Sequence, residues 1–266
     1  MPTRVSATGS GDAGARRLFG GSRVVTAAAR RRAFVRRLLR WYRAHKRDLP
    51  WRRTSDPYRI LVSEIMLQQT QVDRVVPKYH EFLRRYPSIS TLARASVGSV
   101  RETWYPLGYN IRPVRLHAIA REVMARHEGQ IPDDREVLLR LKGIGPYTAG
   151  AILSFAYRQS VPIVDTNVRR VLQRVFYGRA KPRDSVLWRL AERLLLEGTV
   201  YDFNQGLMDL GATVCVARTP RCAICPVRAV CRAAPHFARE RPRRETRGAP
   251  ASKAGSRRTS RKDTAG

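Results

Sequence analysis

Apolar residues recur every three or four positions along most of this chain, which is the spacing of one buried face of an α-helix. In the stretch AAARRRAFVRRLLRWYRAHK, residues 27–46, the stripe consists of Phe34, Val35, Leu38, Leu39 and Tyr42. The same spacing predicts helices at residues 60–69, 72–85, 90–105, 113–127, 134–141, 147–157, 167–177, 185–195 and 201–214. The stretch SVPIV (160–164) has a β-like composition but is too short and isolated to make a sheet. The pattern therefore predicts an all-α fold.

Two of the predicted helices are separated by an unusual connection, in the stretch LKGIGPYTAGAILSF (141–155). Gly143 and Gly145 are expected to take positive φ angles in a tight turn, and Pro146 suits the first turn of the following helix. Such a hairpin leaves backbone N–H groups free at the start of the second helix, where an anion such as a DNA phosphate can bind. A plain connection between two helices uses the same residue types, so both interpretations remain open.

The excess of basic residues indicates what kind of molecule this protein binds. The 266 residues include 52 Lys and Arg but 21 Asp and Glu, for a net charge of +31. This excess favours a polyanionic partner, either nucleic acid or an acidic membrane surface. The chain contains no run of about 18 apolar residues, so nothing is expected to span a membrane. Residues 1–26 are interpreted as a disordered basic arm. Residues 232–266, with 11 Lys and Arg against 3 Asp and Glu, are interpreted as a disordered basic tail.

All four cysteines lie close together near the end of the predicted helical region: Cys215, Cys222, Cys225 and Cys231. A disulfide framework would spread its cysteines along the chain, whereas four thiolates within one short segment can surround a single metal centre. Zinc is bound by sets of four cysteines, and so are iron–sulfur clusters. The spacing leaves the metal open and leans slightly towards iron–sulfur.

Several segments, taken together and in order, resemble one known family. They are LPWR (49–52), SEIMLQQTQV (63–72), LGYN (107–110), GIGPYTAGAILSFAY (143–157), VDTNVRRVL (164–172) and FNQGLMDLGATVC (203–215). With the cysteine spacing, they are similar to the helix–hairpin–helix DNA glycosylases of the endonuclease III and MutY group, and most of all to MutY-type adenine glycosylases. The resemblance covers roughly residues 41–231.

This resemblance implies two helical lobes with a pocket for DNA and the excised base between them. Residues 27–58 and 178–231 would form the lobe next to the metal cluster, and residues 59–177 a helical-barrel lobe that contains the hairpin 141–148. The implied activity is hydrolysis of the N-glycosidic bond of adenine mispaired with guanine or 8-oxoguanine. The implied metal centre is one 4Fe–4S cluster on the four cysteines, with zinc as the alternative.

The resemblance also assigns the chemistry to particular side chains. Glu64 would protonate the flipped adenine, and Asp165 would face the positively charged sugar. Asn167 would orient the site, and Tyr147 would support the water and the sugar. By themselves, Glu64 is usually read as a solvated helix residue and Asp165 as a helix N-cap. Tyr147 stands where the bifunctional lyases carry a lysine, so the resemblance implies a monofunctional enzyme, with Lys142 near enough for weak lyase activity.

Recognition of DNA and of the base is carried over in the same way. Gln69 and Tyr109 match the residues that separate the base stack, and Gln205 matches a reader of the adenine edge. The apolar Leu67 and Trp51 are expected to bury Glu64. The remaining implied contacts with DNA or the base are those of Arg52, Gly143 and Gly145.

Two alternatives remain at this point. Only 35 residues follow Cys231, too few for the MutT-like domain that reads oxidised guanine in typical MutY proteins. A core without that domain also resembles the thymine/uracil glycosylases that act on G·T or G·U pairs. A non-catalytic DNA-binding protein with structural zinc would leave Glu64 and Asp165 unexplained. The expected partner is double-stranded DNA with a mismatch or an oxidised guanine, and no membrane. We expect a cytoplasmic, nucleoid-associated monomer of bacterial or archaeal type.

Overall fold

The computed structural model describes residues 26–108 and 111–239. Within these residues every regular element is a helix and no strand forms, so the prediction of an all-α fold is confirmed. The predicted basic arm and most of the predicted basic tail lie outside the described residues, as does Tyr109. No helix of the described part is both long and apolar enough to cross a lipid bilayer.

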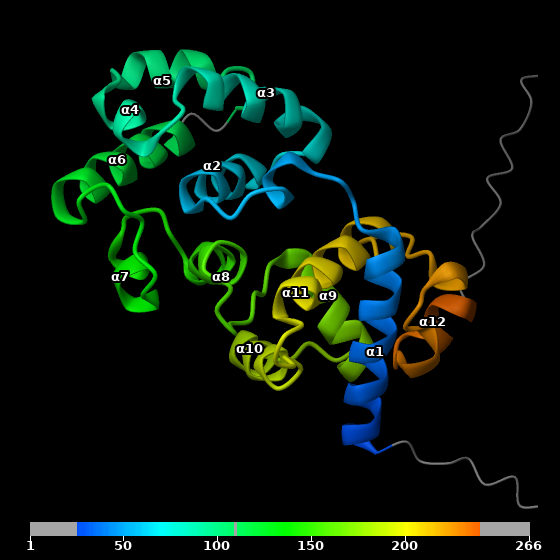
Figure 1. Cartoon of the computed structure of the whole chain (residues 1–266). Helices are drawn as coiled ribbons and strands as arrows, with labels where there is room; N and C mark the ends of the chain where they lie inside the picture. The colour runs from blue at the N-terminus through cyan, green and yellow to red at the C-terminus, as the bar shows by residue number, and fades with distance from the viewer. Residues whose placement is uncertain (1–25, 109–110, 240–266) are drawn as a thin grey trace, which may run out of the picture.

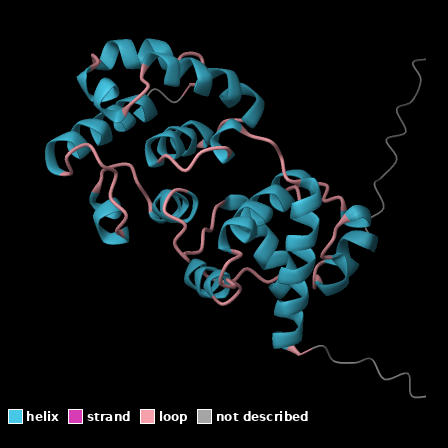
Figure 2. Cartoon of the chain, in the orientation of Figure 1, coloured by secondary structure: helices cyan, strands magenta, loops and turns pink. Residues whose placement is uncertain are grey.

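The helices gather into two lobes, and the chain starts in one lobe, builds the other and then returns to the first (Figure 1). Loops and turns join the helices wherever the connecting residues are described (Figure 2). One lobe contains α2 (Pro57–Leu67), α3 (Val72–Arg85), α4 (Ile89–Arg94), α5 (Val97–Trp104), α6 (Ile111–Arg126), α7 (Arg135–Arg140) and α8 (Pro146–Phe155). The other contains α1 (Ala27–His45), α9 (Thr166–Leu172), α10 (Asp184–Glu192), α11 (Val200–Asp209) and α12 (Ala234–Arg239).

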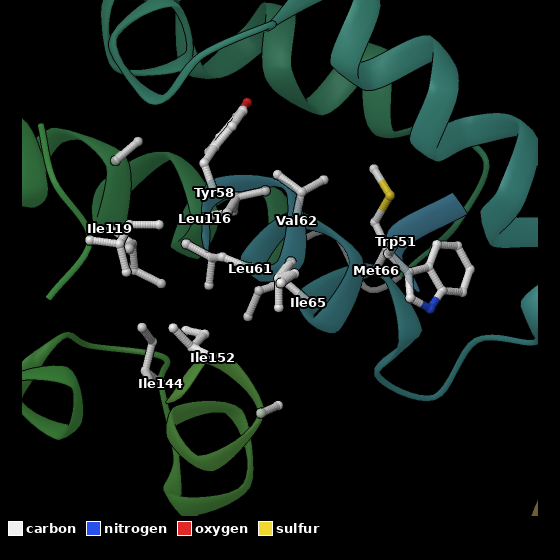
Figure 3. Packing of buried hydrophobic residues seen from close by; sticks show 14 of the residues in the cluster. Trp51, Tyr58, Leu61, Val62, Ile65, Met66, Leu116, Ile119, Ile144 and Ile152 are labelled. Carbon is white, nitrogen blue, oxygen red and sulfur yellow. The ribbon is translucent and has the colours of Figure 1, made fainter. Parts of the chain in front are cut away.

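Helix α2 lies at the centre of the α2–α8 lobe. Residues 60–66 of this helix are all buried, so it has no face towards solvent there. A helix that is apolar on every side is stable only when other helices surround it. Figure 3 shows side chains of α2, α6 and the hairpin with α8 packed together: Leu61, Val62, Ile65, Leu116, Ile119, Ile144 and Ile152.

The boundary between the lobes differs from the one implied by the resemblance. The structure divides the core between Ile163 and Val164, whereas the expected helical-barrel lobe extended to residue 177. Residues 164–177 belong to the other lobe because α9 and the turn after it pack against α1, where the rings of Phe34 and Phe176 lie 5.2 Å apart. Trp51 and Tyr58, expected in the cluster-side lobe, pack into the core of the α2–α8 lobe.

Polar side chains set where several helices begin. Thr26, Asp56, Ser88 and Asp134 each accept a hydrogen bond from a backbone N–H in the first turn of the helix that follows. Ser96 does the same for α5, and its extended backbone separates α4 from α5. The single helix predicted for residues 90–105 is therefore wrong, because the apolar spacing continues across a break that the Ser96 cap stabilises.

Two predicted helices end in π-helical turns, Gln173–Tyr177 (η2) after α9 and Leu210–Val214 (η3) after α11. At η2, the carbonyl groups of Arg174 and Val175 accept hydrogen bonds from the N–H groups of Ala233 and Arg232, at 3.0 Å each. These bonds hold the chain that leads into α12. The expected start of a disordered tail at residue 232 is therefore wrong, since residues 234–239 form a helix.

In the hairpin between α7 and α8, the backbone agrees with the prediction at two of three positions. Gly143 has a φ of +114° and Pro146 opens α8, as predicted. Gly145 has a φ of −97° and an extended backbone, so the prediction of a positive φ there is wrong. Its Cβ position is open, with no atom of the described chain within 4 Å. Gly145 thus leaves free space beside the start of α8 rather than relieving strain.

Gly150 lies inside α8, where this helix packs closely on the segment before α9. A Cβ at position 150 would lie 2.8 Å from the carbonyl oxygen of Pro162. We expect Gly150→Ala to lower the free energy of unfolding by about 1–3 kcal/mol, because the two backbones must move apart. Urea unfolding measures the effect. The control is Gly98→Ala on the exposed face of α5, which we expect to raise stability by up to about 1 kcal/mol. A Gly150→Ala protein as stable as the parent would contradict this packing.

Candidate active site

A cavity of about 720 Å³ lies between the two lobes. Helix ends surround it: the C-terminal end of α2 with the loop that follows, the first turn of α8 and the first turn of α9, together with one face of α11. Nine of the residues named from the sequence line this cavity, namely Trp51, Arg52, Glu64, Leu67, Gln69, Tyr147, Asp165, Asn167 and Gln205. The structure thus brings together side chains that are up to about 150 positions apart in the chain.

Glu64 is the only charged residue in the stretch ILVSEIML (60–67), and it is 3% exposed. Burial raises the pKa of the Glu64 carboxyl group to about 7. The hydroxyl group of Tyr147 and the charge of Arg52 lower this pKa, and the charge of Asp165 raises it, but burial has the largest effect. The buried oxygen Oε2 has no hydrogen-bond partner among the described residues. A carboxyl group in this state can donate a proton near neutral pH to a molecule in the cavity.

Tyr147 follows Pro146 in the first turn of α8, so the helix start aims it into the cavity. Its hydroxyl group lies 3.9 Å from the sulfur of Met208 on α11. Burial and the negative charges of Glu64 and Asp165 raise the pKa of Tyr147 well above its ordinary value. The phenol therefore keeps its proton and serves as a hydrogen-bond donor.

Asp165 is both a helix cap and a cavity residue. Its Oδ1 accepts a hydrogen bond from the N–H of Val168 at 2.7 Å, which makes it the N-cap of α9. Its Oδ2 accepts another from the side-chain amide of Asn167 at 3.0 Å. These two bonds fix the carboxyl group at the cavity wall, where its charge raises the pKa of Glu64. The interpretation of Asp165 as an N-cap is confirmed.

The hydrogen bonds continue from Asn167 towards the cysteine segment. The side-chain oxygen of Asn167 accepts from Arg170 at 2.8 Å, and Arg170 donates in turn to the carbonyl oxygen of Cys215 at 2.7 Å. Arg174, one turn further, donates to the carbonyl oxygens of Val216 and Ala217, at 2.7 Å each. The wall of the cavity and the loop that begins at the first cysteine are therefore connected through side chains of α9 and η2.

Arg52 and Asp209 form a buried ion pair across the two lobes. The guanidinium group of Arg52 donates to both carboxylate oxygens of Asp209, at 2.8 Å each, and Arg47 donates to the same carboxylate at 2.6 Å. The Asp209 side chain is 1% exposed. Burial raises the pKa of Asp209, but the hydrogen bonds and charges of Arg52 and Arg47 outweigh burial and hold the pKa below its ordinary value. The pair links the segment before α2 to α11.

The sequence analysis missed some of these residues, although a signal was present for Asp209. Asp209 follows Gln205 by four positions, which puts both on one face of α11. No comparable signal marks Arg170, because nothing in the sequence indicates that Arg170, rather than a neighbouring arginine, points inward.

Two of the described residues named from the sequence as contacts with DNA or the base are absent from the lining of the cavity. Gly143 and Gly145 lie in the hairpin before α8, and Tyr109 is outside the described residues. Gln69 lies at the tip of the loop after α2 with a φ of +55°, an uncommon conformation for a residue other than glycine. Gln205 is 4% exposed and lines the cavity from α11.

The four cysteines line a second, smaller cavity beside η2 and η3. Their thiols are half-buried and unpaired, and Arg174, Arg221 and Arg228 line the same cavity. The described residues contain no group of three His, Cys, Asp or Glu side chains that could hold a metal ion. Ala233, together with Ala234 and Phe237 of α12, closes one side of this cavity.

Residues 62–195, which carry most of the cavity wall, match the family described as HhH-GPD superfamily base excision DNA repair protein. The chain belongs to this superfamily. An adenine DNA glycosylase of Mycobacterium tuberculosis is 49% identical over 199 residues, which are 71% of this chain and 64% of that protein. The chain thus spans about 64% of the length of this curated relative.

Another relative and a solved structure carry names with other bases than adenine. A thymine/uracil-DNA glycosylase of Pyrobaculum aerophilum is 39% identical over 198 residues, covering 71% of this chain and 86% of that protein. The solved structure of a thermostable thymine-DNA glycosylase superposes with a TM-score of 0.75 at 33% identity, over 79% of this chain and 98% of that one. The helix–hairpin–helix glycosylase fold implied by the sequence is therefore confirmed.

The raised pKa of Glu64 makes a prediction about stability. Since the folded protein holds this proton more tightly than the unfolded chain, whose glutamate pKa is 4.5, Glu64 destabilises the fold progressively as pH rises from 4.5 to about 7. Glu64→Gln removes this effect. Relative to the parent, we expect the variant to gain about 3 kcal/mol of unfolding free energy between about pH 4.5 and about pH 8.

Urea unfolding of both proteins across this pH range measures the gain. Glu102→Gln, at an exposed position of α5, is the control and should keep a constant difference from the parent. Parallel pH profiles for the Glu64→Gln protein and the parent would show that the Glu64 carboxyl group titrates as it does in water.

Proposed function

We propose that this protein is a monofunctional DNA glycosylase that hydrolyses the N-glycosidic bond of adenine mispaired with guanine or 8-oxoguanine. The observation that carries the proposal is the cavity in which a buried Glu64 with a pKa of about 7 lies close to Asp165. The adenine glycosylase of M. tuberculosis, at 49% identity, supports adenine as the base.

Glu64 acts as the general acid in this proposal. An adenine anion is a poor leaving group, so cleavage needs a proton on the base. Burial keeps a large fraction of Glu64 protonated near pH 7, and its Oε2 has no partner among the described residues, so the proton is available to the base. After the base leaves, the ionised carboxylate can accept a proton from the attacking water.

Asp165 stabilises the sugar. Cleavage leaves positive charge on the ring, and two hydrogen bonds, from the N–H of Val168 and the amide of Asn167, hold the Asp165 carboxyl group at the cavity wall. A pair of carboxyl groups around a breaking glycosidic bond serves sugar hydrolases in a similar way. Asn167 orients Asp165 in this proposal, and the Tyr147 hydroxyl group supports the water and the sugar.

Water, rather than an amine of the protein, is the nucleophile in this proposal. Tyr147 lines the cavity, and the resemblance to the bifunctional lyases would place the lysine of a Schiff base at this position. Lys142 lies on the hairpin with an exposed side chain and is absent from the described lining of the cavity. The product is therefore an intact strand with an abasic site, with weak strand cleavage by Lys142 as a side reaction.

A base inside a duplex cannot reach Glu64, so the target nucleotide must leave the stack. Gln69, at the tip of the loop after α2, fills the place of the extruded base in this proposal. Leu67 and Trp51 enclose the base, and Arg52 and Gln205 contact its polar edge. The hairpin at Gly143 and Gly145 and the start of α8 receive a backbone phosphate, with the open space at Gly145 admitting it closely.

Thymine or uracil opposite guanine is the second candidate substrate. The specific observation in its favour is the thymine/uracil-DNA glycosylase of P. aerophilum, of which this chain covers 86% at 39% identity. The same carboxyl groups serve either reaction, so the choice depends on the edge that Gln205 and Arg52 present to the base.

Single-turnover base release tests the proposal on four duplexes, with A opposite 8-oxoguanine, A opposite G, T opposite G and U opposite G. We expect adenine to be released from the first two only. Glu64→Gln should keep duplex binding but lower the rate of release by about 10²- to 10⁴-fold, because the proton donor is lost. Glu102→Gln is the matched control. Release of thymine or uracil instead would support the second candidate, and full activity of the Glu64→Gln protein would exclude Glu64 from the mechanism.

We propose that Cys215, Cys222, Cys225 and Cys231 hold one 4Fe–4S cluster that stabilises this end of the protein for DNA binding. Four thiols line one cavity, which is the number of donors that this group needs, although no three of them are grouped so as to hold a single metal ion, and the arginines of the same cavity balance its negative charge. Structural zinc is the alternative, since four cysteines also bind zinc. The cluster contributes no step to the reaction proposed above.

Metal analysis together with the visible absorption spectrum distinguishes the 4Fe–4S cluster from structural zinc. We expect iron and sulfide in the purified protein, and we expect Cys222→Ser to lose both and to weaken DNA binding more than the chemical step at saturating enzyme. Ile224→Ser, an exposed neighbour in the same loop, should keep its metal. Stoichiometric zinc in place of iron would support the alternative.

The proposed partner is double-stranded DNA that contains a mismatch or an oxidised guanine, bound by a monomer. The excess of 52 Lys and Arg over 21 Asp and Glu favours it, because phosphate neutralisation releases counterions. The proposed location is the nucleoid in the cytoplasm of a bacterial or archaeal cell.

A further inference from the structure

Arg112, on α6, is a buried arginine that no part of the proposed reaction uses. It is 4% exposed, whereas most of the arginines that the structure describes face solvent. Its guanidinium group lies 5.5 Å from the centre of the Trp104 ring. A buried guanidinium group is costly unless hydrogen-bond acceptors surround it. The acceptors around Arg112 therefore indicate what it holds in place.

The first set of acceptors is at the end of α2. Nη1 of Arg112 donates to the carbonyl oxygens of Ile65 at 3.2 Å, Met66 at 2.9 Å and Gln68. The last carbonyl groups of a helix have no partner within the helix and carry partial negative charge. A guanidinium group from α6 thus closes the C-terminal end of the helix that carries Glu64.

The second set lies in the loop after α2 and in the turn between α5 and α6. Nη2 of Arg112 donates to the hydroxyl oxygen of Thr70 at 3.0 Å and to the carbonyl oxygens of Leu107 at 3.1 Å and Gly108 at 3.2 Å. The same side chain therefore ties the loop at residues 68–71 to a turn about 40 positions further along the chain.

The residue between these contacts is Gln69. Its φ of +55° costs about 1–2 kcal/mol for a residue with a Cβ, and such a conformation persists only where the surroundings hold it. Arg112 contacts Gln68 on one side of it and Thr70 on the other, and the Thr70 hydroxyl group also donates to the carbonyl oxygen of Gln68 at 3.2 Å. The strained residue at the tip is held by these bonds, while its own side chain is left exposed.

We propose that Arg112 is a positioning residue that preorganises the loop at residues 68–71, so that Gln69 enters the base stack without a further ordering step. This inference rests on the proposed function, because it assigns Arg112 to the base-flipping stage of that reaction. Arginine is required at this position, since its planar group reaches acceptors in two directions at once, whereas the ammonium group of lysine is a point charge with three donors.

The test separates base flipping from chemistry. In Arg112→Lys, single-turnover release of adenine from a fully stacked A·G duplex should fall by about 10- to 100-fold. With adenine placed opposite an abasic-site analogue, where the base leaves the stack more easily, the loss should be much smaller. Equal losses on the two duplexes would overturn the proposal, because they would assign Arg112 to folding or to the chemical step.

A second measurement follows base unstacking alone, without cleavage of the glycosidic bond. With 2-aminopurine at the target position and the Glu64→Gln background, the rise in fluorescence reports unstacking. We expect Arg112→Lys to slow this rise, with Arg121→Lys, an exposed arginine of the same helix, as the unchanged control. An unchanged rise in the Arg112→Lys protein would also overturn the proposal.

Thr70→Val covers the case in which Arg112→Lys does not fold. It removes one of the three acceptors of Nη2 and the bond to Gln68, keeps a similar volume, and should give a smaller loss in the same direction. If Thr70→Val left both duplexes unaffected, it would overturn the proposal. A parent protein that releases adenine from no duplex refutes the proposed function instead, which keeps the two failures distinct.

Discussion

A carboxyl group that leaves water loses the solvation that favours its charged form, and in this protein that group is the side chain of Glu64. It lies on a helix whose residues 60–66 are all buried. The core around α2 therefore has two roles. It supplies the apolar contacts that stabilise the α2–α8 lobe, and it raises the pKa of Glu64 to about 7, which suits a proton donor at neutral pH.

The same burial explains why the site lies between two lobes. A cavity wall made only by the α2–α8 lobe would leave Glu64 facing water, and its pKa would return towards the ordinary value. Helices α9 and α11 cover the open side and bring Asp165, Asn167 and Gln205 to it. The ion pair of Arg52 with Asp209 links the two sides of this cavity, with both partners buried.

Two of the many arginines are distinguished by what their guanidinium groups contact. Arg52 meets a carboxylate across the lobes, and Arg112 meets carbonyl oxygens at the end of α2 and in a neighbouring turn. Both use the planar group to hold separate segments in fixed positions. Among the described residues, most of the other basic side chains are exposed, where they add to the positive potential of the surface.

The sequence by itself determined the helices and the chemistry of the side chains. Spacing located α1 and its buried stripe, Gly143 and Pro146 marked the hairpin, and motif resemblance named Glu64 and Asp165, because these features are local in the chain. Three predictions were wrong: a positive φ at Gly145, an unbroken helix through Ser96, and disorder where α12 forms. A helix cap or a distant hydrogen bond decides each of these features. Only the tertiary structure decided that Glu64 is buried opposite Asp165, that residues 164–177 join the lobe of α1, and that Arg112 points inward. These outcomes depend on contacts between segments about 40 to 150 positions apart, and helical spacing carries no information about which segments meet.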